Sequence, residues 1–162
     1  MKKTHVTWNE VQSHVQSIIR QMVLEKWTPD IIVGITRGGA VPAVMISNYF
    51  NCKMVSLDVS LRDNTEYGPE SNCWLPEDAE TKKILIVDDI NDTGATVNWI
   101  MSDWSSLVLH DKWKDNVKFA MLYDNQASNA TVDIAFSAVD INKAEDDIWI
   151  VFPWENFWNS NS

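Results

Sequence analysis

The sequence predicts an α/β protein in which a mostly parallel central sheet is flanked by helices. Short apolar runs alternate along the chain with amphipathic stretches at helical spacing, which is typical of this architecture. The apolar runs are continuous rather than alternating, as expected for parallel strands buried on both faces. A chain of 162 residues suits one domain, so we expect residues 1–162 to fold as a single unit.

The first half of the chain contains two predicted helices and two predicted strands. Thr7 and Glu10 form a capping-box pattern that starts the first helix, whose apolar positions extend to Val23. Strands are predicted at 31–35 and 53–58. The second helix lies between them, and its predicted buried face carries Val41, Val44 and Met45.

The second half begins with a polar stretch, 61–82, that has no periodicity. A loop of this length inside a domain is usually functional or mobile. The clearest strand of the sequence follows at 84–87. A third helix then carries Val97, Ile100, Met101, Trp104 and Val108 on one face, and further strands are predicted at 117–122, 132–136 and 148–152.

Composition excludes several classes of function. The formal net charge of −10 argues against a nucleic-acid-binding protein, which needs a basic surface to neutralise phosphates. Cys52 and Cys73 lack zinc-site spacing and fit a reducing compartment. Neither a secretory signal nor a membrane-spanning run is apparent, so we expect a cytoplasmic protein with no membrane partner.

The segment 84–96, ILIVDDINDTGAT, carries the main chemical signal. Asp88 and Asp89 follow a buried strand, and their mutual repulsion requires compensation by hydroxyl donors or by Mg²⁺. The residues from Asp92 to Thr96 precede a helix, where free N–H groups and the helix dipole favour a phosphate. The acidic pair alone, or the stretch from Asp92 to Thr96 alone, is also typical of an ordinary loop or helix cap. Together they indicate a site for a phosphorylated sugar.

This segment resembles the signature that binds phosphoribosyl pyrophosphate (PRPP) in type I phosphoribosyltransferases. Residues 31–39, IIVGITRGG, resemble the pyrophosphate loop of that family, and residues 149–155, WIVFPWE, resemble its base-binding hood. The likeness is greatest to the small bacterial and archaeal xanthine-guanine or hypoxanthine type. It implies the type I phosphoribosyltransferase fold with a small C-terminal hood, mainly within 123–162, and a flexible catalytic loop at about 61–82 that closes over the site during reaction.

The resemblance also implies roles for the acidic pair and the two loops. Asp88 and Asp89 would hold the ribose hydroxyls and orient Mg²⁺ indirectly, through those hydroxyls or water. Asp92 would in addition act as general base or proton relay near N7 of a purine. The 5′-phosphate would be bound by Asp92, Thr93, Gly94, Ala95 and Thr96. Pyrophosphate would be bound, through a strained or cis peptide, by Thr36, Arg37, Gly38 and Gly39.

The implied function is Mg²⁺-dependent transfer of the 5-phosphoribosyl group from PRPP to a nucleobase, expected to be a purine. Pyrophosphate and a nucleoside monophosphate would be the products, with Arg37 and the three aspartates as catalytic residues. Trp149 would stack on the base, and Ile150 would offer backbone groups to it. A homodimer or larger homo-oligomer is implied too. The alternative is a non-catalytic regulatory protein that binds PRPP.

One feature departs from the family pattern. Enzymes for 6-oxopurines usually carry a lysine just after the strand that follows the PRPP helix, whereas residues 120–125 here are AMLYDN. Asn125 could donate a weaker, neutral hydrogen bond to the base. Asp124 would instead accept from an amino group, so an altered base preference stays open.

Overall fold

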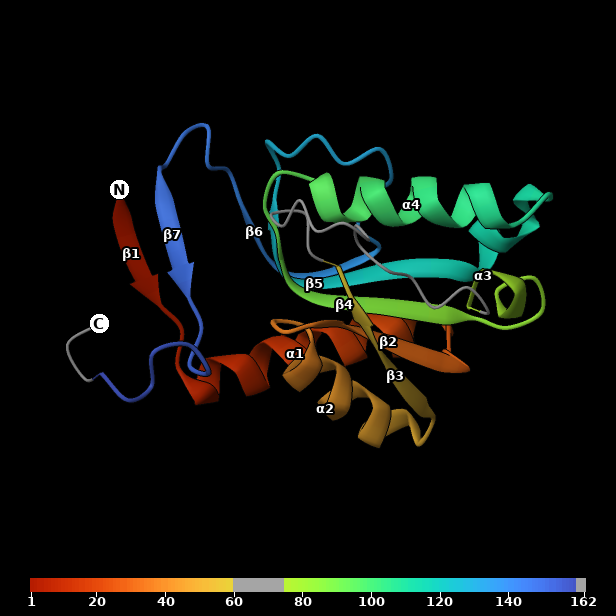
Figure 1. Ribbon diagram of the computed structural model, residues 1–162. Helices are drawn as coiled ribbons and strands as arrows, with labels where there is room; N and C mark the ends of the chain where they lie inside the picture. The colour runs from red at the N-terminus through yellow and green to blue at the C-terminus, as the bar shows by residue number, and fades with distance from the viewer. Residues whose placement is uncertain (60–74, 160–162) are drawn as a thin grey trace.

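The computed structural model describes residues 1–59 and 75–159, which form two parallel sheets and the helices around them (Figure 1). The strands are β1 (Lys2–His5), β2 (Ile31–Thr36), β3 (Lys53–Asp58), β4 (Ile84–Asn91), β5 (Val117–Asn125), β6 (Phe136–Ile141) and β7 (Ile148–Val151). The helices are α1 (Trp8–Leu24), α2 (Ala40–Phe50), α3 (Leu75–Asp78), α4 (Ala95–Leu107) and the 3-10 helix η1 (Asp111–Asn116). The predicted α/β class is confirmed.

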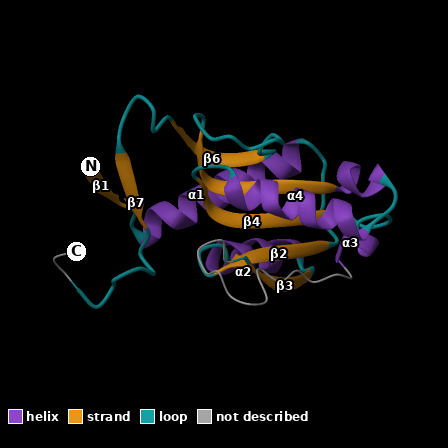
Figure 2. Ribbon diagram, turned by 45° about the horizontal axis from the view of Figure 1, so that its top comes forward, coloured by secondary structure: helices purple, strands orange, loops and turns teal. Residues whose placement is uncertain are grey.

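The central sheet has five parallel strands in the order β3-β2-β4-β5-β6, which Figure 2 shows from a second direction. Helices α1 and α2 cover one face and α4 covers the other (Figure 1). Side chains of β4 alternate between these layers, with Leu85 packing on the α1 side and Ile86 on the α4 side. The continuous apolar run of β4 therefore reflects burial on both faces.

The predicted start of the first helix is confirmed. The Glu10 backbone N–H donates to Thr7 Oγ1 at 3.1 Å, and the Thr7 N–H donates to Glu10 Oε1 at 3.2 Å. These two bonds satisfy donors that a helix end otherwise leaves open, and they form the complete capping box that the sequence predicts.

Two predictions were wrong in part: on the predicted face of α2, Met45 packs against the core but Val44 does not, and one strand begins later than expected. Helix α2 buries Pro42, Ala43 and Ile46, whereas Val44 is 45% exposed. The strand predicted at 132–136 begins only at Phe136. Val132 and Ile134 precede it outside any strand and pack against the α4 side of the core. Their apolar character therefore reflects packing of a connecting segment.

The C-terminal part of the loop predicted at 61–82 contains a short helix. Residues 61–74 lie outside the described residues. Helix α3 and the turn after it occupy the remainder, and Leu75 and Ala79 are fully buried against the α4 side of the core. Backbone bonds from Ala79 to Leu75 and from Lys82 to Asp78 hold this segment in place.

The second sheet pairs the two ends of the chain. Strands β1 and β7 run parallel and stand beside the central sheet (Figure 1). We call this sheet, together with residues 152–159, the hood. Strand β6 belongs to the central sheet, so the predicted hood range of 123–162 was too wide and also lacked β1. No helix in the described part of the chain is long and apolar enough to cross a membrane.

Candidate active site

The acidic pair, Asp88 and Asp89, lies in the C-terminal half of the central strand β4. Strand β4 is flanked by β2 and β5, and its pairing with β5 continues beyond the pair to Asn91. The Asp89 N–H donates to Asp88 Oδ1 at 2.8 Å, and the Ile90 N–H donates to Asp89 Oδ1 at 2.7 Å. These bonds fix both carboxylates at the carboxyl end of the sheet, where ligands of open α/β folds bind.

Burial raises the pKa of both carboxyl groups. The pKa of Asp88 lies well above its usual value because of desolvation and then the neighbouring charge of Asp89. Desolvation likewise raises the pKa of Asp89, hydrogen bonds oppose this increase, and the charge of Glu155 adds to it. An ionised pair at this position therefore gains from a ligand that brings hydroxyl donors or a cation.

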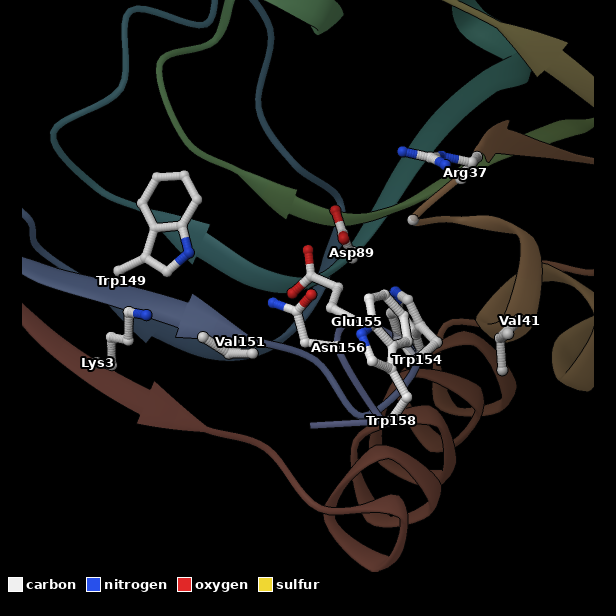
Figure 3. A pocket seen from close by; sticks show the side chains of 11 residues that line it. Lys3, Arg37, Val41, Asp89, Trp149, Val151, Trp154, Glu155, Asn156 and Trp158 are labelled. Atoms are coloured by element: carbon white, nitrogen blue, oxygen red, sulfur yellow. The ribbon is translucent and has the colours of Figure 1, made fainter. Parts of the chain in front are cut away.

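The loop between β2 and α2 packs directly on the acidic pair. The peptide bond between Thr36 and Arg37 is cis, one of the two forms that the family resemblance implied. A β-carbon at Gly38 would overlap the Asp89 carboxylate, and one at Gly39 would overlap backbone atoms of β2 and β4. Only glycine permits this approach. Arg37 is thereby brought to the same cavity as Asp89 (Figure 3).

The turn between β4 and α4 forms a small concavity of about 70 Å³. Its lining includes Asp88 and all five predicted phosphate-binding residues, from Asp92 to Thr96. Gly94 has a φ of 91° and precedes the first residue of α4. A helix N-terminus at a turn of this kind favours an anion. The acidic pair thus lies between this turn and the Thr36–Gly39 loop.

A larger cavity of about 700 Å³ opens between the central sheet and the hood (Figure 3). Its lining from the β2–α2 loop, α2 and β4 comprises Arg37, Gly38, Val41 and Asp89. The hood contributes Lys3, Trp149, Val151, Trp154, Glu155, Asn156 and Trp158. Trp149 is 41% exposed and so presents ring surface for stacking. Ile150 is 5% exposed, which leaves its backbone rather than its side chain for a ligand.

Asn125 has a different place from the one expected. It is 6% exposed, and its side-chain Nδ2 donates to the Asp92 carbonyl at 2.8 Å. Its Oδ1 accepts from the backbone N–H groups of Ala127 at 3.2 Å and Lys143 at 2.9 Å. The Asn125 amide therefore joins two loops of the protein to each other, and this buried position disfavours the expected contact with a base.

Sequence reasoning missed two cations of the site. Lys143 places its Nζ 3.1 Å from Asp92 Oδ1 and 5.4 Å from the centre of the Trp149 ring. Lys3 lies opposite Trp149 in the β1–β7 register and lines the large cavity. No local motif marks either residue. Lys3 reaches the site because β1 pairs with the distant strand β7, and Lys143 reaches it through an ion pair between two separate loops.

The donor set of the site suits a metal that is bound mainly through its substrate. The described residues contain no group of three or more histidine, cysteine or acidic side chains that could enclose an ion. Mg²⁺ typically keeps several waters and uses one or two carboxylates together with substrate phosphates. Asp88 and Asp89 meet that requirement.

Comparison with known proteins identifies relatives over nearly the whole chain. The family described as the phosphoribosyl transferase domain matches residues 7–158. Xanthine-guanine phosphoribosyltransferase of Cereibacter sphaeroides is 29% identical over 163 residues, covering 95% of this chain and 87% of that protein. Purine phosphoribosyltransferase from Pyrococcus horikoshii superimposes with a TM-score of 0.72 at 26% identity, covering 97% and 96% of the two chains. Helicobacter pylori xanthine-guanine-hypoxanthine phosphoribosyltransferase shares the fold, with a TM-score of 0.70 at 16% identity and coverage of 96% and 94%.

Proposed function

Because the chain belongs to the phosphoribosyltransferase family of enzymes, we propose that it transfers the 5-phosphoribosyl group of PRPP to a purine base with Mg²⁺. Pyrophosphate and a purine nucleoside monophosphate are the products. One observation carries the proposal: the Asp88–Asp89 pair stands between two backbone cradles that suit phosphates. PRPP has this pattern, since its ribose diol lies between a 5′-phosphate and a pyrophosphate.

Each part of PRPP then meets a suitable group. The ribose hydroxyls donate to Asp88 and Asp89 and relieve the repulsion between them. The 5′-phosphate occupies the turn from Asp92 to Thr96 at the start of α4. The pyrophosphate lies against the Thr36–Gly39 loop, where Arg37 offers a charged fork of donors.

The reaction depends mainly on positioning and charge stabilisation. Displacement of pyrophosphate passes through an oxocarbenium-like state, as glycoside hydrolysis does. The acidic pair holds the ribose in line for attack, and Arg37 stabilises the charge of the leaving pyrophosphate. Asp92 is proposed to take or relay a proton from N7 of the base. Mg²⁺, when bound, adds charge compensation at the pyrophosphate and the acidic pair.

The base is proposed to occupy the cavity between Asp89 and the hood. Trp149 stacks on its face, and the β7 backbone around Ile150 reaches its edge. Asn125 serves as a positioning residue for the Asp92 loop. The Asp124 carboxylate already accepts from Asn91 Nδ2 at 2.9 Å, which disfavours the alternative in which it receives an amino group of the base.

Pyrophosphate release from PRPP and Mg²⁺ tests the proposal, with guanine, hypoxanthine, xanthine and adenine supplied separately. We expect release with at least one oxopurine and no turnover in the double variant Asp88→Ala with Asp89→Ala. The matched control is Asp111→Ala with Asp115→Ala, which removes the same charge from the exposed helix η1. A fully active Asp88/Asp89 variant would contradict the proposed site.

A second measurement, made beside the pyrophosphate assay, distinguishes the enzyme from a regulatory protein. Calorimetric titration measures PRPP binding without any base. Binding of PRPP combined with no pyrophosphate release for any base would favour a non-catalytic PRPP-binding regulator and reject the transferase proposal.

We also propose that the protein acts in the cytoplasm as a homodimer or larger homo-oligomer. Apolar side chains stand exposed on the hood and the start of α1, including Phe157 at 77%, Trp158 at 73% and Trp8 at 55%. Sedimentation equilibrium measures the mass in solution, and a monomer at micromolar concentration would contradict the proposed assembly.

A further inference from the structure

Lys143 places a cation between Asp92 and Trp149, beside the cavity proposed for the base. It lies in the connection from β6 to β7, and its side chain is only 17% exposed. Its Nζ is 3.1 Å from Asp92 Oδ1 and 5.4 Å from the centre of the Trp149 ring. Trp149 lines the cavity proposed for the base, so the Lys143 ammonium lies next to the ring on which a base would stack, although Lys143 itself is not among the lining residues.

Lys143 is held on two sides, at its ammonium by the ion pair with Asp92 and at its backbone by Asn125. Asn125 Oδ1 accepts from the Lys143 backbone N–H at 2.9 Å, and Asn125 Nδ2 donates to the Asp92 carbonyl at 2.8 Å. One buried amide thus sets the spacing between the loop that carries Lys143 and the loop that carries Asp92. An arrangement held on both sides indicates a built site rather than a flexible surface lysine.

Resting on the function proposed above, we infer that Lys143 determines base specificity by donating a hydrogen bond to an exocyclic oxygen of the purine. A lysine ammonium has three donors and no acceptor. Asp92 accepts from one of them, and the face of Trp149 attracts the charge. A donor that remains can serve a carbonyl oxygen on the base. The exocyclic amino group of adenine cannot accept it, because that group also presents donors.

The chemistry predicts a preference of measurable size. A hydrogen bond to a charged group corresponds to about tenfold to a hundredfold in an equilibrium or rate constant. Adenine meets an unpaired donor at the same place and loses further affinity. Lys143 thus supplies the cationic donor that the sequence lacks directly after β5.

The test compares Lys143→Met with Lys112→Met, which removes the same charge from an exposed position on η1. The ratio kcat/KM is measured for hypoxanthine, guanine and adenine. Affinities for inosine and adenosine monophosphates are measured by calorimetry, which needs no turnover. PRPP affinity without base reports on the integrity of the remaining site, and Lys143→Arg tests whether another cationic donor restores the preference.

We expect Lys143→Met to lower kcat/KM for oxopurines, and affinity for inosine monophosphate, at least tenfold. Adenine and adenosine monophosphate should change little, PRPP affinity should persist, and Lys112→Met should match the wild type. Equal losses for both purine classes, or no loss for oxopurines, would overturn the inference. If the wild type released no pyrophosphate but Lys143→Met still lost its preference for inosine monophosphate, the transferase proposal would fail and the role of Lys143 would stand.

Discussion

Gly38 lies so close to Asp89 that a β-carbon at position 38 would overlap the Asp89 carboxylate. This contact joins the loop after β2 to the acidic pair at the end of β4. Because β2 and β4 are neighbouring parallel strands, both ends meet at the same edge of the sheet. The contact therefore sets the distance between the proposed pyrophosphate site and the proposed ribose site.

Gly38→Ala should raise the KM for PRPP about tenfold or more, because the added methyl displaces either the loop or the Asp89 carboxylate. Overpacking of this kind also costs about 1–3 kcal/mol in the free energy of unfolding. The matched control is Val15→Ile, which adds a methyl group at a buried position of α1 outside the loop. That control should lose stability and keep its KM. Unchanged PRPP kinetics in Gly38→Ala would contradict the proposed pyrophosphate loop.

Asp88→Asn should make the protein more stable and less active at neutral pH. Burial, followed by the charge of Asp89, raises the pKa of Asp88 above its unfolded value of about 3.9. The folded state therefore holds this proton more tightly than the unfolded state. The stability that this proton contributes is present below the unfolded pKa and is lost as pH rises through the folded pKa. A neutral asparagine avoids that loss.

Urea unfolding between pH 5 and pH 8 measures the effect on stability. The advantage of Asp88→Asn over the wild type should grow as pH rises, while turnover falls by roughly a hundredfold. Asp111→Asn, on the exposed helix η1, should follow the wild-type stability curve. A variant that is less stable than the wild type at pH 8 would show that the Asp88 charge is compensated within the folded protein.

The sequence predicted the parts of the site that are contiguous in the chain. Asp88, Asp89 and Gly94 belong to one stretch in which a buried strand leads into a helix, so their chemistry follows from local order. The acidic pair at the end of a strand and the glycine turn before a helix each have a structural meaning without knowledge of the rest of the fold.

The rest depends on contacts that no local pattern records. Lys3 faces the large cavity because β1 pairs with β7, and the polar residues of β1 give no apolar alternation. Lys143 meets Asp92 through the fold of two separate loops. The buried face of α2 could not be chosen either, because its sequence AVPAVMISNYF is apolar on nearly every side.

Asn125→Ala should weaken both the fold and PRPP binding. The change removes bonds to Asp92, Ala127 and Lys143 and leaves their backbone groups without this partner. Loss of a buried hydrogen-bond partner costs about 1–3 kcal/mol in the free energy of unfolding. Chemical unfolding and PRPP titration measure the two effects. Gln126→Ala, whose exposed side chain bonds to Asp124 alone among the described residues, should change neither quantity. If Asn125→Ala lost affinity for the base but kept its affinity for PRPP, Asn125 would be a direct contact of the base, as first expected.

Trp149→Ala should raise the KM for the base by about tenfold to a hundredfold while PRPP affinity changes little. Stacking of a base on an aromatic side chain is worth about 1–3 kcal/mol by alanine substitution. Trp149→Phe keeps an aromatic face and should recover most of the loss. Phe157→Ala is the matched control, because Phe157 is an exposed aromatic residue of the hood that does not line the cavity. Steady-state kinetics with the preferred base measures each variant. If Trp149→Ala kept the wild-type KM for the base, the base would have to bind elsewhere than against the ring of Trp149.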